Sequence, residues 1–179
     1  MSGKFKGRRL VAPPGQGVRP TSDALRETLF NVLGPSVEGA RVLDAFAGTG
    51  ALGLEALSRG AARVTFVERD RRALAVLERN IAACRAEDAC AIIRDDFIGL
   101  AERGSALDHF DLALLDPPYD VPDLDAVVRT AAALAAPHGR VVLEHSRRRP
   151  SPEAAAGLRR TRVLTAGDSA LSFYGPAAP

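Results

Sequence analysis

An aspartate and three glycines lie close together where an apolar run of the chain gives way to a helical pattern. The glycines form the pattern GxGxxG at Gly48, Gly50 and Gly53. Glycine in such a loop permits a sharp turn and lets the backbone approach a ligand closely. Glu68 lies 18 residues after Gly50, at the end of the next apolar run, where its carboxylate can accept hydrogen bonds from both hydroxyls of a ribose. The pattern suits an adenosine cofactor, and NAD and S-adenosylmethionine satisfy it equally.

Asp44 favours one of these two cofactors. It lies four residues before Gly48, at the end of the expected strand. There its charge would repel a pyrophosphate but attract the ammonium and sulfonium groups of S-adenosylmethionine. Capping of the following helix or turn is the alternative role. We therefore expect S-adenosylmethionine to be the cofactor. The residues expected to contact it are Asp44, Phe46, Gly48, Gly50, Glu68, Arg69, Asp96 and Phe97.

The adenine of this cofactor also needs a contact. Asp96 follows a third apolar run and can accept a hydrogen bond from the adenine N6 amine, while Phe97 packs on the ring. Asp96 is equally well placed to cap the helix that follows, and one residue can fill both roles. Arg69, directly after Glu68, would flank the adenine.

A second candidate loop reads Asp116-Pro117-Pro118-Tyr119. Two consecutive prolines cannot continue a strand ladder, so they fix a rigid bend. Rigidity helps to methylate an exocyclic amine of a nucleic-acid base, because the lone pair of that amine is conjugated into the ring. Asp116 and the carbonyl of Pro117 can each hold one N–H, and Tyr119 can stack on the base. We expect these four residues to be catalytic in a direct methyl transfer without a metal; a plain rigid turn is the alternative.

Both loops follow apolar runs that alternate with helical patterns from Arg41 onwards. We expect strands at 41–45, 64–68, 89–94, 111–115 and 140–144, and helices at 51–58, 71–84, 97–103 and 124–135. This alternation predicts a parallel sheet covered by helices on both faces, with ligands at the carboxyl ends of the strands. Strands at 158–164 and 170–174 would form an antiparallel hairpin, and the N-terminal part would hold a strand near 4–11 and a helix at about 22–33.

Composition and charge suggest the kind of partner. The chain has 179 residues, 46% hydrophobic and 26% charged, which is ordinary for one globular domain. The first 41 residues carry seven Lys or Arg and three Asp or Glu, net +4, whereas the rest is −2. A basic arm favours an anionic partner such as nucleic acid, with a merely solvated terminus as the alternative. We expect residues 1–38 to form an extension and 39–179 a single compact catalytic unit.

Targeting and cysteine usage point to one compartment. The basic, polar start lacks the apolar run of a secretion signal, and no apolar stretch approaches the length of a membrane span. Cys84 and Cys90 lack metal-ligand spacing and are expected to be reduced thiols. We therefore expect a cytoplasmic protein without metal or membrane partners. His145 is expected to be structural, whereas Arg147–Arg149 have two open interpretations, a solvated loop or a contact with RNA phosphates.

The two loops together make the chain resemble class I methyltransferases that carry an Asp-Pro-Pro-Tyr loop. More narrowly, it is similar to the RsmD family of bacterial 16S ribosomal RNA guanine-N2 methyltransferases. The resemblance covers nearly the whole chain, and its family-specific parts are the start, Gly3 to Leu10, and the run from Gly167 to Tyr174. It also includes Arg19-Pro20-Thr21, Arg26 to Asn31, Asp44 to Arg59, Asp116 to Tyr119 and Glu144-His145-Ser146.

The resemblance implies a Rossmann-like α/β fold with a seven-stranded, mostly parallel sheet, an antiparallel C-terminal hairpin and a small N-terminal extension. It implies S-adenosylmethionine as methyl donor and a guanine of 16S ribosomal RNA as acceptor, presented by an assembling or assembled small subunit to a monomeric enzyme. The residues that would contact RNA are Lys4, Lys6, Arg8, Arg9, Arg19 and Thr21.

Three other functions stay open on the residues alone. An adenine-N6 methyltransferase acting on DNA or RNA would use the same Asp-Pro-Pro-Tyr loop, although 179 residues leave no room for a separate DNA-recognition domain. An NAD-dependent dehydrogenase would use the glycine pattern and Glu68. A non-catalytic RNA-binding protein would have no need for both Asp44 and Asp116.

Overall fold

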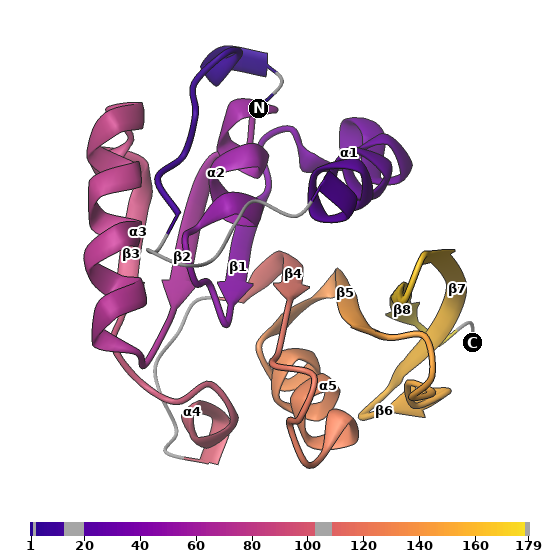
Figure 1. Ribbon diagram of the computed structural model, residues 1–179. Coiled ribbons are helices and arrows are strands. Elements are labelled where there is room, and N and C mark those ends of the chain that lie inside the picture. The colour runs from indigo at the N-terminus through magenta and orange to yellow at the C-terminus, as the bar shows by residue number, and fades with distance from the viewer. Residues whose placement is uncertain (2, 13–19, 103–108, 178–179) are drawn as a thin grey trace.

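The computed structural model describes residues 1, 3–12, 20–102 and 109–177, which form one sheet between two layers of helices (Figure 1). The strands are β1 (Arg41–Ala45), β2 (Arg63–Val67), β3 (Cys90–Ile93), β4 (Phe110–Leu115), β5 (Ala135–Ser146), β6 (Ala154–Ala155), β7 (Leu158–Ala166) and β8 (Ser169–Pro176). The α-helices are α1 (Pro20–Leu33), α2 (Ala51–Ser58), α3 (Arg71–Cys84), α4 (Ile98–Glu102) and α5 (Leu124–Ala133). Short 3-10 helices are η1 (Gly3–Phe5), η2 (Gly34–Val37) and η3 (Glu87–Ala89).

The order of the strands across the sheet is β3-β2-β1-β4-β5-β8-β7-β6. β1 to β5 pair in parallel, as strands joined by crossover helices do, and β8 lies antiparallel between β5 and β7. Gly167, at φ 60°, lies in the turn between β7 and β8. The α/β class, the parallel core and the C-terminal antiparallel hairpin are confirmed.

The expected count of seven strands is wrong, because the described part of the chain contains an eighth, the two-residue β6. β6 pairs with the start of β7 through a turn at Ala156 and Gly157, which have φ values of 47° and 84°. Two successive positive φ values are typical of a tight two-residue hairpin turn. Alanine rarely adopts this conformation, so Ala156 gave no turn signal in the sequence.

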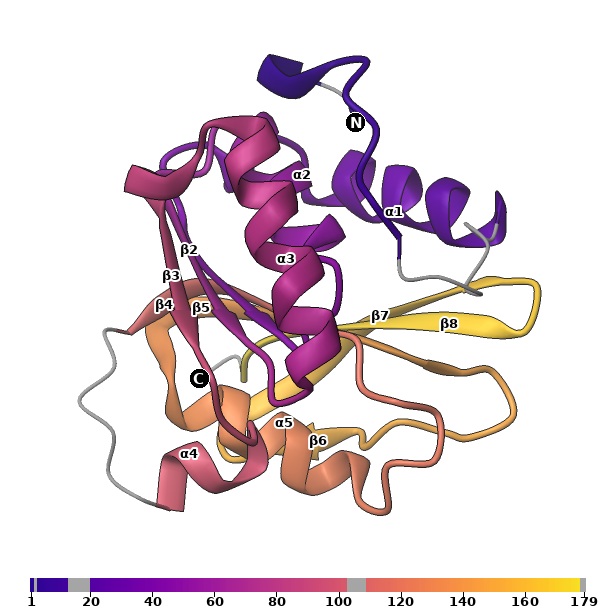
Figure 2. The ribbon, with the colours of Figure 1, turned by 60° about the vertical axis from the view of Figure 1, so that its left-hand side comes forward.

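The expected strand near residues 4–11 is also wrong. The segment begins with η1 and continues without regular structure over α2 and α3, away from the edges of the sheet (Figure 2). Its backbone bonds to side chains instead of to a strand: Phe5 N–H donates to Ser58 Oγ at 2.8 Å, and Val11 N–H donates to Asn80 Oδ1 at 2.8 Å. These contacts satisfy main-chain groups that a sheet edge would otherwise satisfy.

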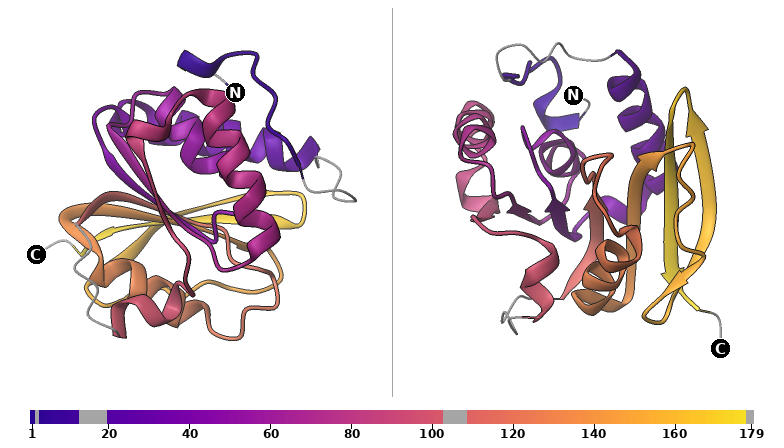
Figure 3. Two further views of the ribbon diagram at one scale, coloured as in Figure 1. Left: turned by 90° about the vertical axis from the view of Figure 1, so that its left-hand side faces the viewer. Right: turned by 60° about the horizontal axis from the view of Figure 1, so that its bottom comes forward.

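Two apolar clusters hold the helices on opposite faces of the sheet (Figure 3). The first joins α1, α2 and α3 to one face, with Leu29, Leu54 and Leu77 among its buried members. The second joins α4 and α5 to the other face, with Leu100 and Val127 among its members. Each face of a parallel sheet therefore receives the cover that such sheets require. Within the described residues, no helix combines the length and apolar character needed to span a membrane.

β5 begins earlier than the sequence indicates. Its register to β4 passes from Phe110↔Ala135 to Leu112↔Arg140, so the residues between them on β5 bulge out of the ladder. Pro137 lies in this bulge, where its missing N–H costs no ladder bond. Beyond the bulge the register is regular as far as Leu115↔Leu143, so β4 and β5 deliver their next residues to the same edge.

Candidate functional site

Asp44 lies at the carboxyl end of β1 and is 1% exposed. Its Oδ2 accepts a 2.7 Å hydrogen bond from the N–H of Gly53, in the first turn of α2. α2 has no side-chain cap of its own at Gly50, so the capping role weighed for Asp44 is real. Among the described residues, no hydrogen bond to the other carboxylate oxygen is found, so that oxygen remains available to a ligand.

Negative charge accumulates around Asp44. Burial raises the pKa of Asp44 well above its usual range; the hydrogen bond from Gly53 lowers it, and the charges of Asp116 and Glu68 raise it again. A buried carboxylate beside two others is stabilised by a cation and destabilised by an anion. Among the described residues, these acids do not form a cluster of three or more potential metal ligands. The negative charge of Asp44, Asp116 and Glu68 favours a cationic ligand and would repel a pyrophosphate.

The glycine loop is shaped for a ligand at one position and for packing at another. Gly48 has φ 55°, and a Cβ built there would meet only the carbonyl oxygen of Phe46, at 3.9 Å. Gly50 has φ 78°, and a Cβ there would lie 2.4 Å from Cδ1 of Leu77. Gly48 thus leaves open space above the loop, whereas Gly50 allows the loop to pack on α3. The space above Gly48 and the adjacent acids fit S-adenosylmethionine.

Glu68, which follows β2, holds the loop from the side. Its Oε2 accepts from the N–H of Gly48 at 2.9 Å, and its Oε1 accepts from the N–H groups of Arg69 and Asp70 at 2.8 Å each. A carboxylate offers about four acceptor positions. Glu68 is half-buried, so it retains an acceptor position for a ribose hydroxyl while it fixes the backbone of the loop.

The residues expected around the adenine lie in two contacting pairs, one exposed pair and one pair that includes a buried ring. The guanidinium of Arg69 forms a 3.0 Å ion pair with Asp96 at the surface. Phe97 is only 2% exposed, and its ring meets the ring of Phe46 edge-on, with centroids 5.4 Å apart. Phe46 has φ 60°, a conformation that non-glycine residues rarely adopt and that is concentrated at functional sites. Phe97 therefore packs against the ring of Phe46 from the buried side.

Asp116 follows β4 directly, and its N–H donates to the carbonyl of Ala45 at 3.4 Å, which ties the second loop to the first. Its side chain keeps exposed surface, yet burial raises its pKa to about 7, with a further contribution from Glu144. Solvent therefore reaches part of this side chain although protein surrounds most of its carboxyl group. A carboxyl group with a pKa near neutrality exchanges protons readily at physiological pH.

The rest of the second loop presents an aromatic ring. Pro117 is buried and Pro118 is exposed, and the carbonyl of Pro118 accepts from the N–H of Val121 at 2.9 Å. Tyr119 is 47% exposed, and its hydroxyl lies 2.6 Å from Oγ of Ser169 in β8. The ring is therefore fixed at its hydroxyl end and open along its body, as a stacking surface for a base requires.

His145 and Arg149 stabilise the segment that follows the Asp-Pro-Pro-Tyr loop. His145 is 5% exposed; its Nδ1 is 2.8 Å from the carbonyl of Arg149, and its Nε2 is 2.9 Å from Oγ of Ser172. The guanidinium of Arg149 in turn donates to the carbonyls of Val121 and Pro122. His145 thus has the structural role expected of it, and Arg149 holds the segment after Tyr119.

Three residues of the site escaped the sequence interpretation. Asn80, fully buried in α3, donates to the carbonyl of Thr49 at 2.9 Å and to that of Val11 at 3.1 Å, so it joins the glycine loop to the N-terminal segment. Ser169 and Glu144 line the second loop from β8 and β5. Of these three, only Glu144 could have been recognised from the sequence, because it lies at the carboxyl end of the expected fifth strand.

The basic arm lies partly away from the site. The side chains of Lys4, Lys6, Arg8 and Arg9 are exposed. The backbone of Phe5 bonds to Ser58, the last residue of α2, whereas the glycine loop expected to bind the cofactor precedes the first residue of α2. Arg8 donates to the carbonyl of Ala83 and stacks over Phe5, so it also fastens the arm. Arg19 lies outside the described residues, as does the side chain of Thr21.

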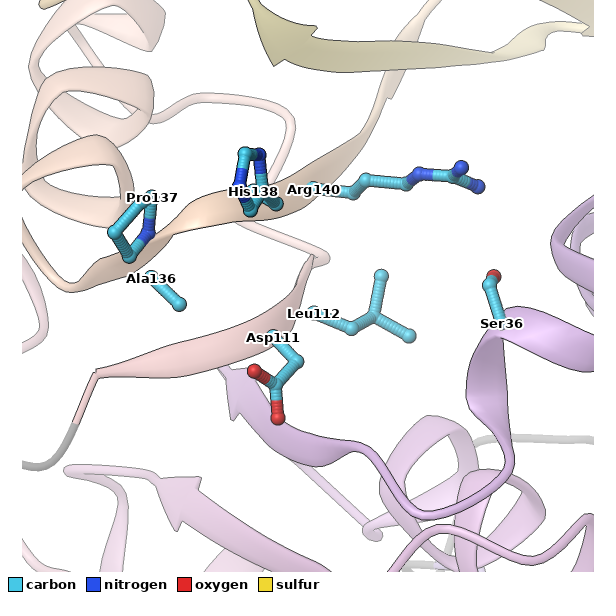
Figure 4. A pocket seen from close by; sticks show the side chains of 7 residues that line it. All are labelled: Ser36, Asp111, Leu112, Ala136, Pro137, His138 and Arg140. Carbon is cyan, nitrogen blue, oxygen red and sulfur yellow. The ribbon is translucent and has the colours of Figure 1, made fainter.

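A cavity of about 330 Å³ lies at the amino ends of β4 and β5, at the end of the strands opposite to the Asp-Pro-Pro-Tyr loop (Figure 4). Its lining residues come from the starts of β4 and β5 and from η2, and Asp111 is held there by two side-chain hydrogen bonds from Arg41. Asp111 and Asp116 stand at opposite ends of β4, about 16 Å apart at the usual rise per residue. This cavity is therefore separate from the crevice at the carboxyl ends, where open α/β sheets bind their ligands.

The sheet order, the glycine loop with its buried acid and the Asp-Pro-Pro-Tyr loop beside it define a class I, S-adenosylmethionine-dependent methyltransferase. Residues 1–175 match the family described as Conserved hypothetical protein 95. The chain belongs to this family, the RsmD family.

Named relatives agree with this assignment. The chain is 36% identical over 180 residues to the Putative rRNA methyltransferase YlbH of Bacillus subtilis, covering 97% of this chain and 96% of that protein. It is 43% identical over 119 residues to the Ribosomal RNA small subunit methyltransferase D of Escherichia coli, covering 66% of this chain but only 59% of that protein. The solved structure of the putative methyltransferase yhhF from Escherichia coli has a TM-score of 0.83 and 32% identity, with 100% of this chain and 97% of that chain covered.

Proposed function

We propose that this protein transfers a methyl group from S-adenosylmethionine to the exocyclic N2 amine of a guanine in 16S ribosomal RNA. The observation that carries the proposal is the proximity of Asp116 to Asp44: the N–H of Asp116 donates to the carbonyl of Ala45, the residue after Asp44, at 3.4 Å. The charge of Asp116 also raises the pKa of Asp44. One acid lies in the crevice suited to a cationic methyl donor, and the other begins the loop suited to a base. The names of the relatives in Bacillus subtilis and Escherichia coli support ribosomal RNA as the substrate.

The chain's own residues account for the binding of both reactants. Asp44 and the loop at Gly48 hold the donor, which when bound supplies a methyl group on a positively charged sulfur. Glu68 accepts from the ribose, and Asp96 accepts from the adenine amine. Phe46, supported by Phe97, and Arg69 border the adenine. These assignments rest on the exposed acceptor positions and on the open space above Gly48.

Asp116 and the carbonyl of Pro117 accept the two N–H groups of the target amine and turn its lone pair towards the methyl carbon. The C–N bond forms as the C–S bond breaks, the bonding pair stays on sulfur, and Asp116 accepts the proton that nitrogen releases. Pro118 keeps the bend rigid, and Tyr119 stacks on the base, which is worth about 1–3 kcal/mol. Holding both reactants in line can lower the barrier by roughly 7–11 kcal/mol.

The N-terminal segment would hold the RNA. We propose that residues 39–179 form the catalytic unit and residues 1–38 a basic extension, in a protein that acts as a monomer on an assembling or assembled small subunit. Lys4, Lys6 and Arg9 are exposed and free to contact phosphates, and Arg8 presents charge while it fastens the arm. Arg19 and Thr21 complete the proposed contacts.

The test is nucleoside analysis of the product. Purified protein is incubated with radiolabelled S-adenosylmethionine and small subunits from cells that lack the corresponding activity, and the RNA is digested to nucleosides. We expect the label in N2-methylguanosine. Label in N6-methyladenosine would replace the proposed target by adenine, and absence of label from the RNA of the subunits would overturn the proposal.

A further inference from the structure

Glu144 stands beside Asp116 because of the register between β4 and β5. Leu115 pairs with Leu143, so the next residue of each strand reaches the same edge of the sheet. Leu114 and Val142, two residues earlier, both pack in the cluster that faces α1 to α3. Side chains alternate along a strand, so Asp116 and Glu144 project on that same face. The electrostatic influence of Glu144 on Asp116 agrees with this placement.

Glu144 also shares a cavity with the second loop. A space of about 10 Å³, enough for about one water molecule, is bordered by Pro117, Pro118, Tyr119 and Glu144. The side chain of Ser169 lies close enough to Glu144 to lower the pKa of its carboxyl group, and its hydroxyl lies 2.6 Å from the hydroxyl of Tyr119. Glu144 thus borders the Asp-Pro-Pro-Tyr loop, where the base is proposed to bind.

The carboxylate of Glu144 has acceptor capacity that the protein does not use. Within the described residues Glu144 forms no ion pair, and Ser169 is the one neighbour whose side chain lowers its pKa, so most of its roughly four acceptor positions stay open. Burial raises the pKa of Glu144, as it raises that of Asp116. When both are ionised, these adjacent carboxylates favour a ligand that brings two adjacent N–H donors, and binding such a ligand stabilises the ionised forms.

The pairing edges of the purines differ in this respect. Guanine presents its N2 amine next to N1–H, so both neighbouring groups are donors. Adenine presents its N6 amine next to N1, which is an acceptor and would face the Glu144 carboxylate. We infer that Glu144 determines specificity by accepting N1–H of the target guanine while Asp116 holds the N2 amine. This inference rests on the proposed function and assigns base selection to a residue outside the Asp-Pro-Pro-Tyr loop.

The inference is tested with a substrate in which the N1–H donor of guanine is replaced by an acceptor and O6 is absent, so the comparison between variants, not the wild-type preference alone, isolates the contact at N1. Synthetic RNA reconstituted into subunits carries either guanosine or 2-aminopurine riboside at the methylated position. 2-Aminopurine keeps the 2-amine but has an acceptor at N1. For the wild-type protein, kcat/KM is expected to be at least about a hundredfold lower with 2-aminopurine, because a buried carboxylate facing an acceptor is left unpaired.

Glu144→Gln should reduce this preference at least about tenfold, because an amide can donate to the acceptor at N1. Glu153→Gln is the matched control: it removes a carboxylate that is 90% exposed and follows the same strand. It should leave the preference unchanged. Circular dichroism and S-adenosylmethionine affinity are measured for each variant.

The outcomes separate the inference from the proposed function. If the wild-type protein methylates no guanine-containing RNA, the proposed function fails. If it methylates guanine and the preference is at least tenfold smaller in Glu144→Gln, the inference stands. An equal loss with both RNAs, partial or complete, overturns it, since a role in folding or in aligning the amine affects both substrates alike.

Discussion

The hydroxyl of Tyr119 lies 2.6 Å from the hydroxyl oxygen of Ser169, which joins the Asp-Pro-Pro-Tyr loop to the antiparallel strand β8. Either of the two hydroxyl groups can be the donor in this contact. A strand near the C-terminus therefore orients the aromatic ring that is proposed to stack on the base. The antiparallel insertion of β8 beside β5 is what brings Ser169 to this edge.

Ser169→Ala is predicted to lower kcat/KM for RNA about threefold to tenfold, mainly through KM, because one hydrogen bond of about 0.5–1.5 kcal/mol no longer orients the ring. Tyr119→Phe should have a similar effect, and Tyr119→Ala a larger one because stacking is lost. Steady-state kinetics with each variant checks this order. Equal activity of wild-type protein and Tyr119→Ala would remove Tyr119 from the base site.

Substitutions in the glycine loop should separate packing from binding. Gly48→Ala is expected to cost about 1–2 kcal/mol of stability for a left-handed alanine. It should weaken S-adenosylmethionine at least about tenfold, since the new methyl group enters the open space above the loop. Gly50→Ala should cost about 1–3 kcal/mol more, because its Cβ would lie 2.4 Å from Leu77. Denaturant unfolding and calorimetric titration measure both quantities; unchanged affinity in Gly48→Ala would contradict the placement of the cofactor.

Stability should depend on pH in opposite senses at the two ends of β4. The pKa of Asp116 is raised to about 7, so the folded protein binds its proton more tightly than the unfolded chain. The free energy of unfolding therefore falls as pH rises from about 4 to about 7, and Asp116→Asn should reduce this fall. Hydrogen bonds from Arg41 lower the pKa of Asp111, so its stabilisation is lost only as pH falls below about 4. Denaturant titrations at several pH values test the contrast; an identical pH dependence in Asp116→Asn and wild-type protein would argue against it.

The arm should contribute to RNA affinity through charge. Changing Lys4, Lys6 and Arg9 together to Gln should weaken RNA binding. It should also reduce the slope of log affinity against log salt by roughly 0.7–0.9 for each phosphate that the protein no longer neutralises, and so by up to about 2.7 if all three side chains contact phosphates. Arg8 is left in place because it fastens the arm to Ala83. Arg63→Gln, at the amino end of β2, serves as a control. An unchanged slope in the triple variant would mean that the arm is only solvated.

Periodicity and glycine placement predict much of the core. The bounds of β1, α2 and α3 agree with the sequence because their apolar patterns are regular and end at turn or capping residues such as Asp70. The N-terminal segment was misjudged because its bonding partners, Ser58 and Asn80, are side chains distant in sequence. Such pairings have no local pattern.

The site was predicted only in part for a related reason. Asp44 and Asp116 end strands whose neighbours are set by the parallel topology, so their convergence follows from the order of the elements. Ser169 and Glu144 reach the site only through the antiparallel placement of β8 and the register of β5. Registers depend on packing over the whole sheet, which one sequence does not specify locally.

The most direct test of the central claim compares methyl transfer and cofactor binding in Asp116→Ala. Asp116 is proposed to hold the amine, while Asp44 and the glycine loop hold the donor. We predict that transfer of tritiated methyl to small-subunit RNA falls by at least about a thousandfold, while S-adenosylmethionine binds to the variant with an affinity within a fewfold of the wild-type value. Transfer at a rate near that of the wild-type protein would contradict the account.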